Sequence, residues 1–192
     1  GLAGRKLAKD DFLPTGPCDT RELWEKITAR SLNRPIRDSL VCHGTHPVRA
    51  EGAKNLPLLR AVAGPQQAAF TDKALHDFTH SSYTLTPDCD RMACRLAGPI
   101  IETVRGSDIL SDGIAAGSVQ VSTNGQPIVM LADHQTTGGY AKIATVISAD
   151  LPMLAQLRPG QSVCFTFVTP QQAVQAVRRQ AELLQAVVAR LD

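Results

Sequence analysis

The stretch Ser118–Ile147 reads SVQVSTNGQPIVMLADHQTTGGYAKIATVI and has the form strand, tight turn, strand, polar loop, strand. Its first residues alternate apolar and polar side chains, which is the period-2 pattern of a β-strand. Asn124-Gly125 is a strong hairpin signal, because both turn residues can adopt a positive φ. The runs Pro127–Ala132 and Ala144–Ile147 are apolar with β-branched members, so we predict two strands that are buried on both faces.

A polar segment, residues 133–142, lies between these two apolar strands and reads DHQTTGGYAK. It offers a carboxylate, an amide, two hydroxyls, a glycine pair, a phenol and an ammonium. A polar loop held by rigid strands is a common way to present a binding site. The residues alone leave two interpretations open: a site for a small, polar, planar substrate, or a structural loop with satisfied hydrogen bonds and a surface lysine.

Composition narrows the class of protein. The chain has 192 residues, of which 43% are hydrophobic and 20% charged, and a formal net charge of +2, which suits one large domain or two small ones. The absence of a dense Lys/Arg stripe argues against nucleic acid as the main partner. No apolar run is long enough to span a membrane and no signal peptide opens the chain, so we predict a cytoplasmic protein without membrane contact.

The cysteines and histidines do not form a recognisable metal motif. The chain has 5 cysteines and no C-x-x-C pair, which favours reduced thiols in a cytosolic protein. His76 and His80 have a spacing that can bind a metal, but no third ligand with suitable spacing is nearby. We therefore predict no metal site.

Short strands joined by turns dominate the rest of the sequence. We predict strands at 56–63, 83–87 and 162–168, a helix that Thr71 caps and that ends near Phe78, and a short helix from Asp150. Thr169 and Gln172 form a capping box for a last, amphipathic helix, whose apolar stripe is expected to pack on the sheet or on a partner. This pattern favours a mainly β fold with a few helices and a closed or nearly closed barrel.

Two arginines lie in the segment 88–99, which reads DCDRMACRLAGP. If this segment is a strand, Arg91 and Arg95 share one face. Two interpretations remain open. The arginines either pair with Asp88 and Asp90 in solvent, or they form a fork that binds a carboxylate or a phosphate.

Three stretches resemble motifs of one family. Residues 89–99, CDRMACRLAGP, resemble S-D-R-M-G-Y-R-L-x-G-P; residues 113–121, GIAAGSVQV, resemble G-I-x-x-G-x-I-Q-V; residues 131–144, LADHQTTGGYAKIA, resemble L-x-D-x-Q-T-T-G-G-Y-P-K-I-A. The chain is thereby similar to the allophanate hydrolase subunit 2 family, also called the 5-oxoprolinase C-subunit family or Kip-antagonist type. A related carboxyltransferase domain occurs in urea carboxylase. The match runs in order from Gly1 to about Phe167.

The resemblance implies a fold and a domain organisation. We expect residues 56–192 to form a cyclophilin-like β-barrel domain with a C-terminal helix, and residues 1–55 to be the end of an N-terminal subdomain plus a linker. Because Gly1–Gly16 resembles the middle of such proteins, the family's N-terminal part is expected to be missing from this chain.

The resemblance also implies an enzyme complex. In it, this protein would be the C subunit, would pair with a B subunit, and would act with a separate A subunit to open 5-oxoproline to L-glutamate at the expense of ATP, together with Mg²⁺. One alternative is a carboxyltransferase that acts with a biotin carboxylase on urea or a related amide. A second is a non-enzymatic regulator that binds a partner protein.

The motifs also supply the expected site residues. Catalytic roles are predicted for Asp133, Tyr140 and Lys142, and Lys142 with the glycine pair is expected to stabilise phosphoryl charge. Arg91 or Arg95 is expected to hold the substrate carboxylate. The substrate-binding residues are predicted to be Arg91, Arg95, Gln120, Gln135, Thr136, Thr137, Gly138 and Gly139, with Asp133 and Gln135 reading the lactam.

Three departures from the motifs bear on these roles. Ala93 and Cys94 stand where Gly and Tyr are usual, which changes a residue expected in a substrate wall. Ala141 replaces a usual Pro, so we expect a less rigid loop. His134 stands at a position that is often Arg.

Overall fold

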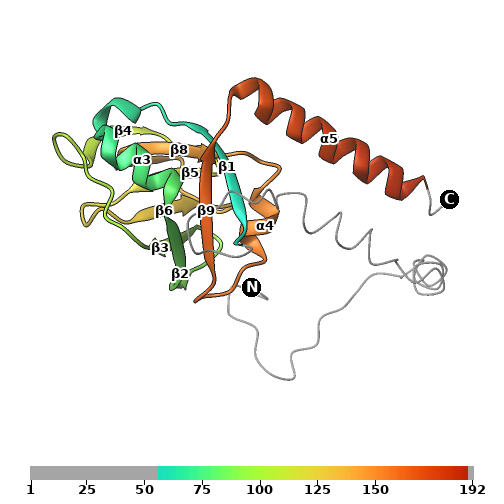
Figure 1. Ribbon diagram of the computed structural model, residues 1–192, viewed down its shortest axis with the longest axis horizontal. Helices are drawn as coiled ribbons and strands as arrows, with labels where there is room; N and C mark the ends of the chain where they lie inside the picture. Colours follow the sequence, from blue (N-terminus) through green and yellow to red (C-terminus); the bar gives the residue numbers. More distant parts are fainter. Residues whose placement is uncertain (1–55, 190–192) are drawn as a thin grey trace, which may run out of the picture.

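The computed structural model describes residues 56–189, and within them a closed β-barrel is the main feature (Figure 1). Its strands follow the order β1–β8–β5–β6–β3–β2–β9, and β4 and β7 form a separate two-stranded sheet. The strands are β1 Leu58–Ala63, β2 Ser82–Cys89, β3 Ala93–Ala97, β4 Asp108–Gly113, β5 Ser118–Val121, β6 Pro127–Met130, β7 Thr137–Tyr140, β8 Lys142–Val146 and β9 Ser162–Phe167. The helices are the 3-10 helix η2 Gln67–Ala69 and the α-helices α3 Asp72–His80, α4 Leu151–Ala155 and α5 Pro170–Val188. The predicted mainly β barrel is confirmed; the prediction for residues 1–55 falls outside the described residues.

A parallel pair closes the barrel. β1 runs parallel to β9, from Leu58↔Cys164 to Ala61↔Phe167, and antiparallel to β8 on its other side. Apolar side chains from all these strands fill the interior, and the largest fully buried ones on the strands are Leu59, Tyr83, Leu85, Leu96, Val119, Val121, Val129, Ile143 and Phe165. Because the barrel is closed, each strand is hydrogen-bonded to a neighbouring strand on both sides, and its inward side chains pack in the core. The barrel wall is therefore a rigid support for side chains on its outer face.

The predicted hairpin is confirmed. β5 and β6 pair antiparallel through Val119↔Val129 and Val121↔Pro127, and Gly125 in the turn has a φ of +75°. The side chain of Asn124 accepts a hydrogen bond from the Ser122 hydroxyl at 2.6 Å. The turn therefore uses the conformational freedom of glycine and the hydrogen-bonding capacity of asparagine, as the sequence predicts.

The segment predicted as a continuous polar loop contains a strand. Thr137–Tyr140 forms β7, which pairs with β4 through Asp108↔Tyr140 and Gly113↔Thr137. The prediction of a loop is wrong on this point. Glycine and polar residues have low strand propensity, so the local sequence does not predict a strand here. The segment is extended because β4 pairs with it through backbone hydrogen bonds.

Two of the three helix N-termini have the side-chain caps that the sequence predicts. Thr71 Oγ1 accepts a hydrogen bond from the Ala74 N–H at 3.1 Å, and α3 continues to His80. Thr169 and Gln172 form the reciprocal capping box, with bonds of 2.8 and 3.2 Å. Asp150 precedes α4 but makes no side-chain cap. Its carboxylate accepts from the Arg60 backbone N–H, Nε and Nη2 instead, because the partner guanidinium is a stronger donor than a helix N–H.

The last helix, α5, extends away from the barrel (Figure 1). It contacts β1, and Gln180 donates a 3.4 Å hydrogen bond to the Ala149 carbonyl. Val174, Val177 and Leu184 of its apolar stripe remain 40–50% exposed, so the described residues bury only part of the stripe.

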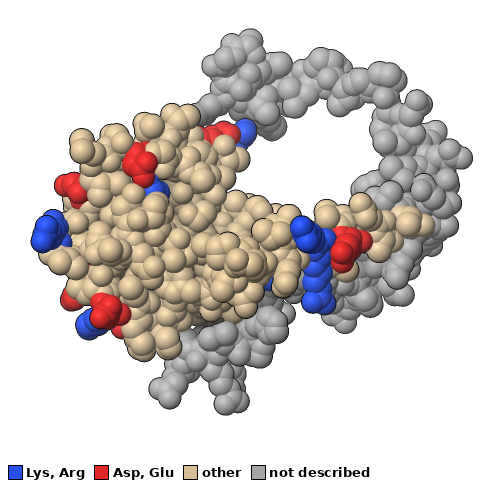
Figure 2. Space-filling view, turned by 90° about the horizontal axis from the view of Figure 1, so that it is seen from above, with Lys and Arg blue, Asp and Glu red and all other residues tan. Residues whose placement is uncertain are grey.

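Charged side chains do not gather by sign on the visible face of the described part. Figure 2 shows small groups in which basic and acidic side chains lie beside one another. No helix within residues 56–189 is long and apolar enough to cross a membrane.

Candidate functional site

Three adjacent barrel strands place Arg95, Ile128 and Gln120 in one row. Arg95 of β3 pairs with Ile128 of β6, and Ile128 pairs with Gln120 of β5. Cross-strand partners point to the same side of a sheet. Because their sequence neighbours Cys94 and Val129 belong to the buried core, the row lies on the outer face of the barrel.

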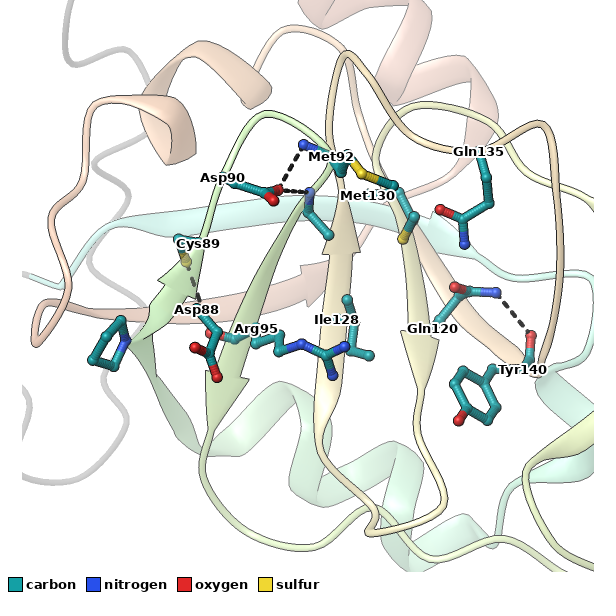
Figure 3. A pocket seen from close by; sticks show the side chains of 12 residues that line it. Asp88, Cys89, Asp90, Met92, Arg95, Gln120, Ile128, Met130, Gln135 and Tyr140 are labelled. Carbon is teal, nitrogen blue, oxygen red and sulfur yellow. Dashed lines mark hydrogen bonds between the residues drawn. The ribbon is translucent and has the colours of Figure 1, made fainter. Parts of the chain in front are cut away.

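A pocket of about 590 Å³ lies over this row (Figure 3). It is lined by Pro87, Asp88, Cys89, Asp90, Met92, Ala93, Arg95, Gln120, Ile128, Met130, Gln135 and Tyr140. In Figure 3 the Arg95 side chain reaches across toward Ile128, and the Gln135 amide points toward Gln120. One wall thus carries a guanidinium, the opposite wall carries two amides, and Ile128 with Met130 forms an apolar surface between them.

The amide of Gln120 is held in place by β7. Gln120 is only 3% exposed, and its Nε2 donates a 3.4 Å hydrogen bond to the Tyr140 carbonyl. A Cβ atom on Gly138 would lie 2.8 Å from Gln120 Nε2 and 2.6 Å from Ile114 Cδ1, whereas one on Gly139 would meet only the Ile109 carbonyl, at 3.5 Å. The first glycine of the pair is therefore needed for the close approach of Gln120.

The glycine pair belongs to a strand. Gly138 pairs with Asp112 of β4, and neither Gly138 nor Gly139 has a positive φ. An anion-binding nest needs a turn or a left-handed residue, so this strand conformation does not supply one. Thr136 and Thr137 of the same segment are exposed, and the Thr136 carbonyl accepts from the Ile114 N–H at 2.9 Å.

Arg91 lies in the turn between β2 and β3, so the expectation that it shares a strand face with Arg95 is wrong. Its Nε lies 2.9 Å from Asp133 Oδ2, and its Nη2 lies 3.1 Å from Asp133 Oδ1. The side chain of Asp90 accepts hydrogen bonds from the Ala93 and then the Met92 N–H groups, and these bonds lower the pKa of Asp90 and hold the turn. Arg91 and Asp133 thus form an exposed ion pair that ties two loops together, outside the lining of the pocket.

The Lys142 side chain is buried and hydrogen-bonded. It is 3% exposed, and Nζ donates to Asp112 Oδ2 at 2.7 Å and to the Gly113 carbonyl at 3.0 Å. The Lys142 ammonium, then the Gln66 amide, hydrogen-bond to Asp112 and lower its pKa to about 2. Lys142 therefore joins the barrel to β4, and the interpretation of a surface lysine is wrong.

The structure brings together four of the predicted site residues: Arg95, Gln120, Gln135 and Tyr140. The others, which are Arg91, Asp133, Thr136, Thr137, Gly138, Gly139 and Lys142, do not line this pocket. Sequence reasoning missed the apolar part of the lining. The alternation of Ile128 and Met130 along β6 is the only local signal for it, and that signal needs the neighbouring strands to be known.

The described residues show what this pocket can do chemically. No group of three His, Cys, Asp or Glu side chains within 56–189 is placed to hold a metal ion. The guanidinium can bind a carboxylate in a two-point contact, and the amides can both donate and accept. The arrangement suits recognition of a small planar molecule that carries a carboxylate and an amide.

Comparison with known proteins identifies the family of this chain. Residues 1–167 match the family described as carboxyltransferase domain, subdomain A and B. The C subunit of 5-oxoprolinase from Haemophilus influenzae is 41% identical over 150 residues, which are 76% of this chain and 48% of that protein. The C subunit of 5-oxoprolinase from Escherichia coli is 35% identical over 195 residues, which are 100% of this chain and 54% of that protein. This chain thus spans about half the length of these relatives.

A solved structure agrees on the fold. The urea carboxylase of Kluyveromyces lactis superposes with a TM-score of 0.62 at 22% identity, over 65% of this chain and 12% of that protein. At this identity the similarity concerns the fold alone. The sequence-based resemblance to the 5-oxoprolinase C-subunit family and to the urea carboxylase domain is confirmed.

Proposed function

Because the chain belongs to the carboxyltransferase domain family, subdomain A and B, we propose that it is part of the C subunit of an ATP-dependent 5-oxoprolinase complex. Its role would be to help open the lactam of 5-oxoproline to L-glutamate. The names of the two bacterial relatives, at 41% and 35% identity, support this proposal. The B subunit and a separate A subunit are the proposed partners, ATP with Mg²⁺ is a proposed substrate of the assembled complex, and the proposed location is the cytoplasm.

The observation that carries the proposal is the row Arg95–Ile128–Gln120 under the pocket. 5-Oxoproline is a nearly flat five-membered ring with a carboxylate on one side, the lactam C=O on the other, and the N–H between them. Arg95 is exposed and has no ion-pair partner in the described part of the chain, so its guanidinium is available for the carboxylate. Gln120 and Gln135 can donate to the lactam oxygen and accept from its N–H.

The ring itself fits between these polar ends. Ile128 and Met130 are buried and offer an apolar surface beside the row. A cavity of about 590 Å³ is of the size that ordinary small-molecule sites have, and it leaves space beside a ligand as small as 5-oxoproline. Tyr140, whose carbonyl holds Gln120, completes the amide side of the pocket.

The remaining predicted residues receive positioning roles in this proposal. The Arg91–Asp133 pair ties the β2–β3 turn to the loop before β7, and the Lys142–Asp112 pair ties β8 to β4. The Arg91–Asp133 pair thus holds the turn that borders the pocket. The Lys142–Asp112 pair holds β4, the partner strand of β7, beside the amides of the pocket. We assign no ATP contact to either pair, because the Lys142 ammonium already donates to two acceptors and the Arg91 guanidinium already contacts Asp133 at two points.

Reconstitution with the partner proteins tests the proposal. The chain, extended to the full-length C subunit, is mixed with candidate A and B subunits, and ATP hydrolysis and glutamate formation are measured with and without 5-oxoproline. Arg95→Gln should raise KM for 5-oxoproline by about 10- to 100-fold, because a hydrogen bond to a charged group contributes about 1.5–3 kcal/mol. Arg105→Gln, an exposed arginine that does not line the pocket, is the matched control and should change KM less than about twofold.

Each alternative has its own result. Unchanged KM in Arg95→Gln would exclude this pocket as the lactam site. Absence of lactam-dependent ATP hydrolysis, with biotin-dependent carboxylation of urea instead, would favour the carboxyltransferase. Stable binding of a partner protein without any turnover would favour the regulator.

A further inference from the structure

Two cysteines face each other at the end of the β2–β3 hairpin. Cys89 of β2 is the cross-strand partner of Cys94 of β3. The next pair toward the turn is joined by a hydrogen bond from the Asp90 N–H to the Ala93 carbonyl, at 3.1 Å. Hydrogen-bonded and non-hydrogen-bonded pairs alternate along an antiparallel ladder, so Cys89 and Cys94 occupy a non-hydrogen-bonded position, where Cα atoms are about 4.5 Å apart. Disulfides form at Cα separations of about 4.4–6.8 Å.

The two thiols differ in access. Cys89 is partly exposed, and its Sγ lies 3.9 Å from the Arg95 carbonyl. Cys94 is 4% exposed and belongs to the barrel core. Burial, and then the neighbouring Cys89 thiol, raise the pKa of Cys94 to about 12. An oxidant in solution will therefore meet Cys89 first.

Both cysteines also border a second cavity. This cavity, of about 620 Å³, lies beside α4 and is mostly apolar, with Leu131 and Leu154 in its lining. Cys89 lines it and the first pocket as well. A small oxidant can thus approach Cys89 from either cavity, and the bond would form in the wall that the two cavities share.

Among the cysteines that the structure describes, only Cys89 and Cys94 lie opposite each other. Cys164 is also buried, but its cross-strand partners are Leu58 and Ser82, so no thiol lies opposite it. Cys164 is therefore a natural control within the same barrel.

We propose that Cys89 and Cys94 are a redox-active pair that a low-molecular-weight disulfide, such as oxidised glutathione, converts reversibly to an intramolecular disulfide. The Cys89 thiolate attacks one sulfur of the oxidant, forms a mixed disulfide and releases one reduced thiol. Cys94 then loses its proton and attacks Cys89 Sγ, which forms the Cys89–Cys94 bond and releases the second reduced thiol. Two protein thiols are oxidised, one disulfide is reduced to two thiols, and both protons end on the released thiols.

The bond would act on the turn between the strands. It would tie β2 to β3 one pair before the turn that Asp90 caps and that presents Arg91 to Asp133. Oxidation would thereby lock the shared wall of both cavities.

Trypsin offers a direct assay, because it cuts after Arg91, between the two cysteines. The folded 192-residue chain is equilibrated in buffers of oxidised and reduced glutathione, free thiols are blocked, and the chain is digested without reduction and analysed by mass spectrometry. We expect the peptides 74–91 and 92–95 to be joined by a disulfide that increases with the proportion of oxidised glutathione and disappears with dithiothreitol. The linkage should be lost in Cys89→Ser and in Cys94→Ser and kept in Cys164→Ser.

The wild-type measurement alone can overturn the proposal. If oxidised wild-type chain carries only glutathione on Cys89, Cys94 does not reach it and the pair is not redox-active. The same conclusion follows if the linked peptides are no more abundant in the folded chain than in a chain oxidised in urea, where pairing among the 5 cysteines is unguided.

Discussion

Substitution of Gly138 by alanine should change the candidate site while the fold remains intact. The added Cβ would lie 2.6 Å from Ile114 Cδ1 and 2.8 Å from Gln120 Nε2. Both atoms are ends of flexible side chains, so they can move while the backbone of β7 stays in place. The Gln120 amide would then leave the Tyr140 carbonyl and turn into the pocket.

The two destabilising effects of the substitution outweigh the one stabilising effect by a small amount. Losing the Gln120 hydrogen bond costs about 1 kcal/mol. A displaced rotamer costs about 0.5–1.5 kcal/mol. Replacing a glycine without positive φ by alanine stabilises by about 0.4–1 kcal/mol through the unfolded chain. The net loss in the free energy of unfolding should be about 1 kcal/mol, which lowers Tm by about 2–4 °C in a chain of this size.

Thermal unfolding and NMR test this reasoning together. The side-chain NH₂ resonance of Gln120, assigned through its loss in Gln120→Ala, should shift strongly in Gly138→Ala. Gly139→Ala is the matched control, because its Cβ would make only an ordinary 3.5 Å contact with the Ile109 carbonyl. An unchanged Gln120 resonance in Gly138→Ala, or an equal shift in Gly139→Ala, would refute the argument.

Three further substitutions or conditions test the ion pairs. Asp150→Ala should lower the free energy of unfolding, measured with urea, by about 3–5 kcal/mol. The reason is that the buried carboxylate accepts three hydrogen bonds from Arg60. A loss below about 1 kcal/mol would contradict this prediction. The pKa of Asp112 is lowered from 3.8 to about 2, so its stabilising effect is complete above pH 3.8 and is lost as the pH falls toward 2. The urea midpoint of wild type should therefore fall in this window more than that of Lys142→Met, and parallel curves would exclude the pair as the cause. Arg91→Ala should change the free energy of unfolding by less than about 1 kcal/mol, because the pair with Asp133 is exposed, and a larger loss would show that the pair supports the fold.

Local chemistry was enough to predict several elements of the fold. The β5–β6 hairpin follows from Asn124-Gly125 between two strand patterns, and the helix starts at Thr71 and Thr169 follow from their side-chain oxygens. In each of these cases the determining groups lie within a few residues of one another. Such signals do not depend on where the rest of the chain lies.

The motifs identified the family, but they did not show which of their residues share a site. Arg95, Gln120, Gln135 and Tyr140 come together only because β3, β6 and β5 are neighbours and β7 folds over their outer face. Arg91 is only four positions before Arg95, yet the turn directs it to another loop. Proximity in sequence is a poor guide to a shared pocket when a hairpin turn separates two residues.

The polar segment 133–142 shows where the sequence alone is sufficient and where it is not. Its composition and its buried flanking strands were enough to single it out as a candidate site and, through the motif, to assign the family. Only the tertiary structure decided that its second half is a strand paired with β4, and that Lys142 donates to Asp112, 30 residues earlier. The physical reason is that a polar group takes whichever partner the folded chain brings within hydrogen-bonding distance. That partner is fixed by long-range strand pairing, which local periodicity does not encode.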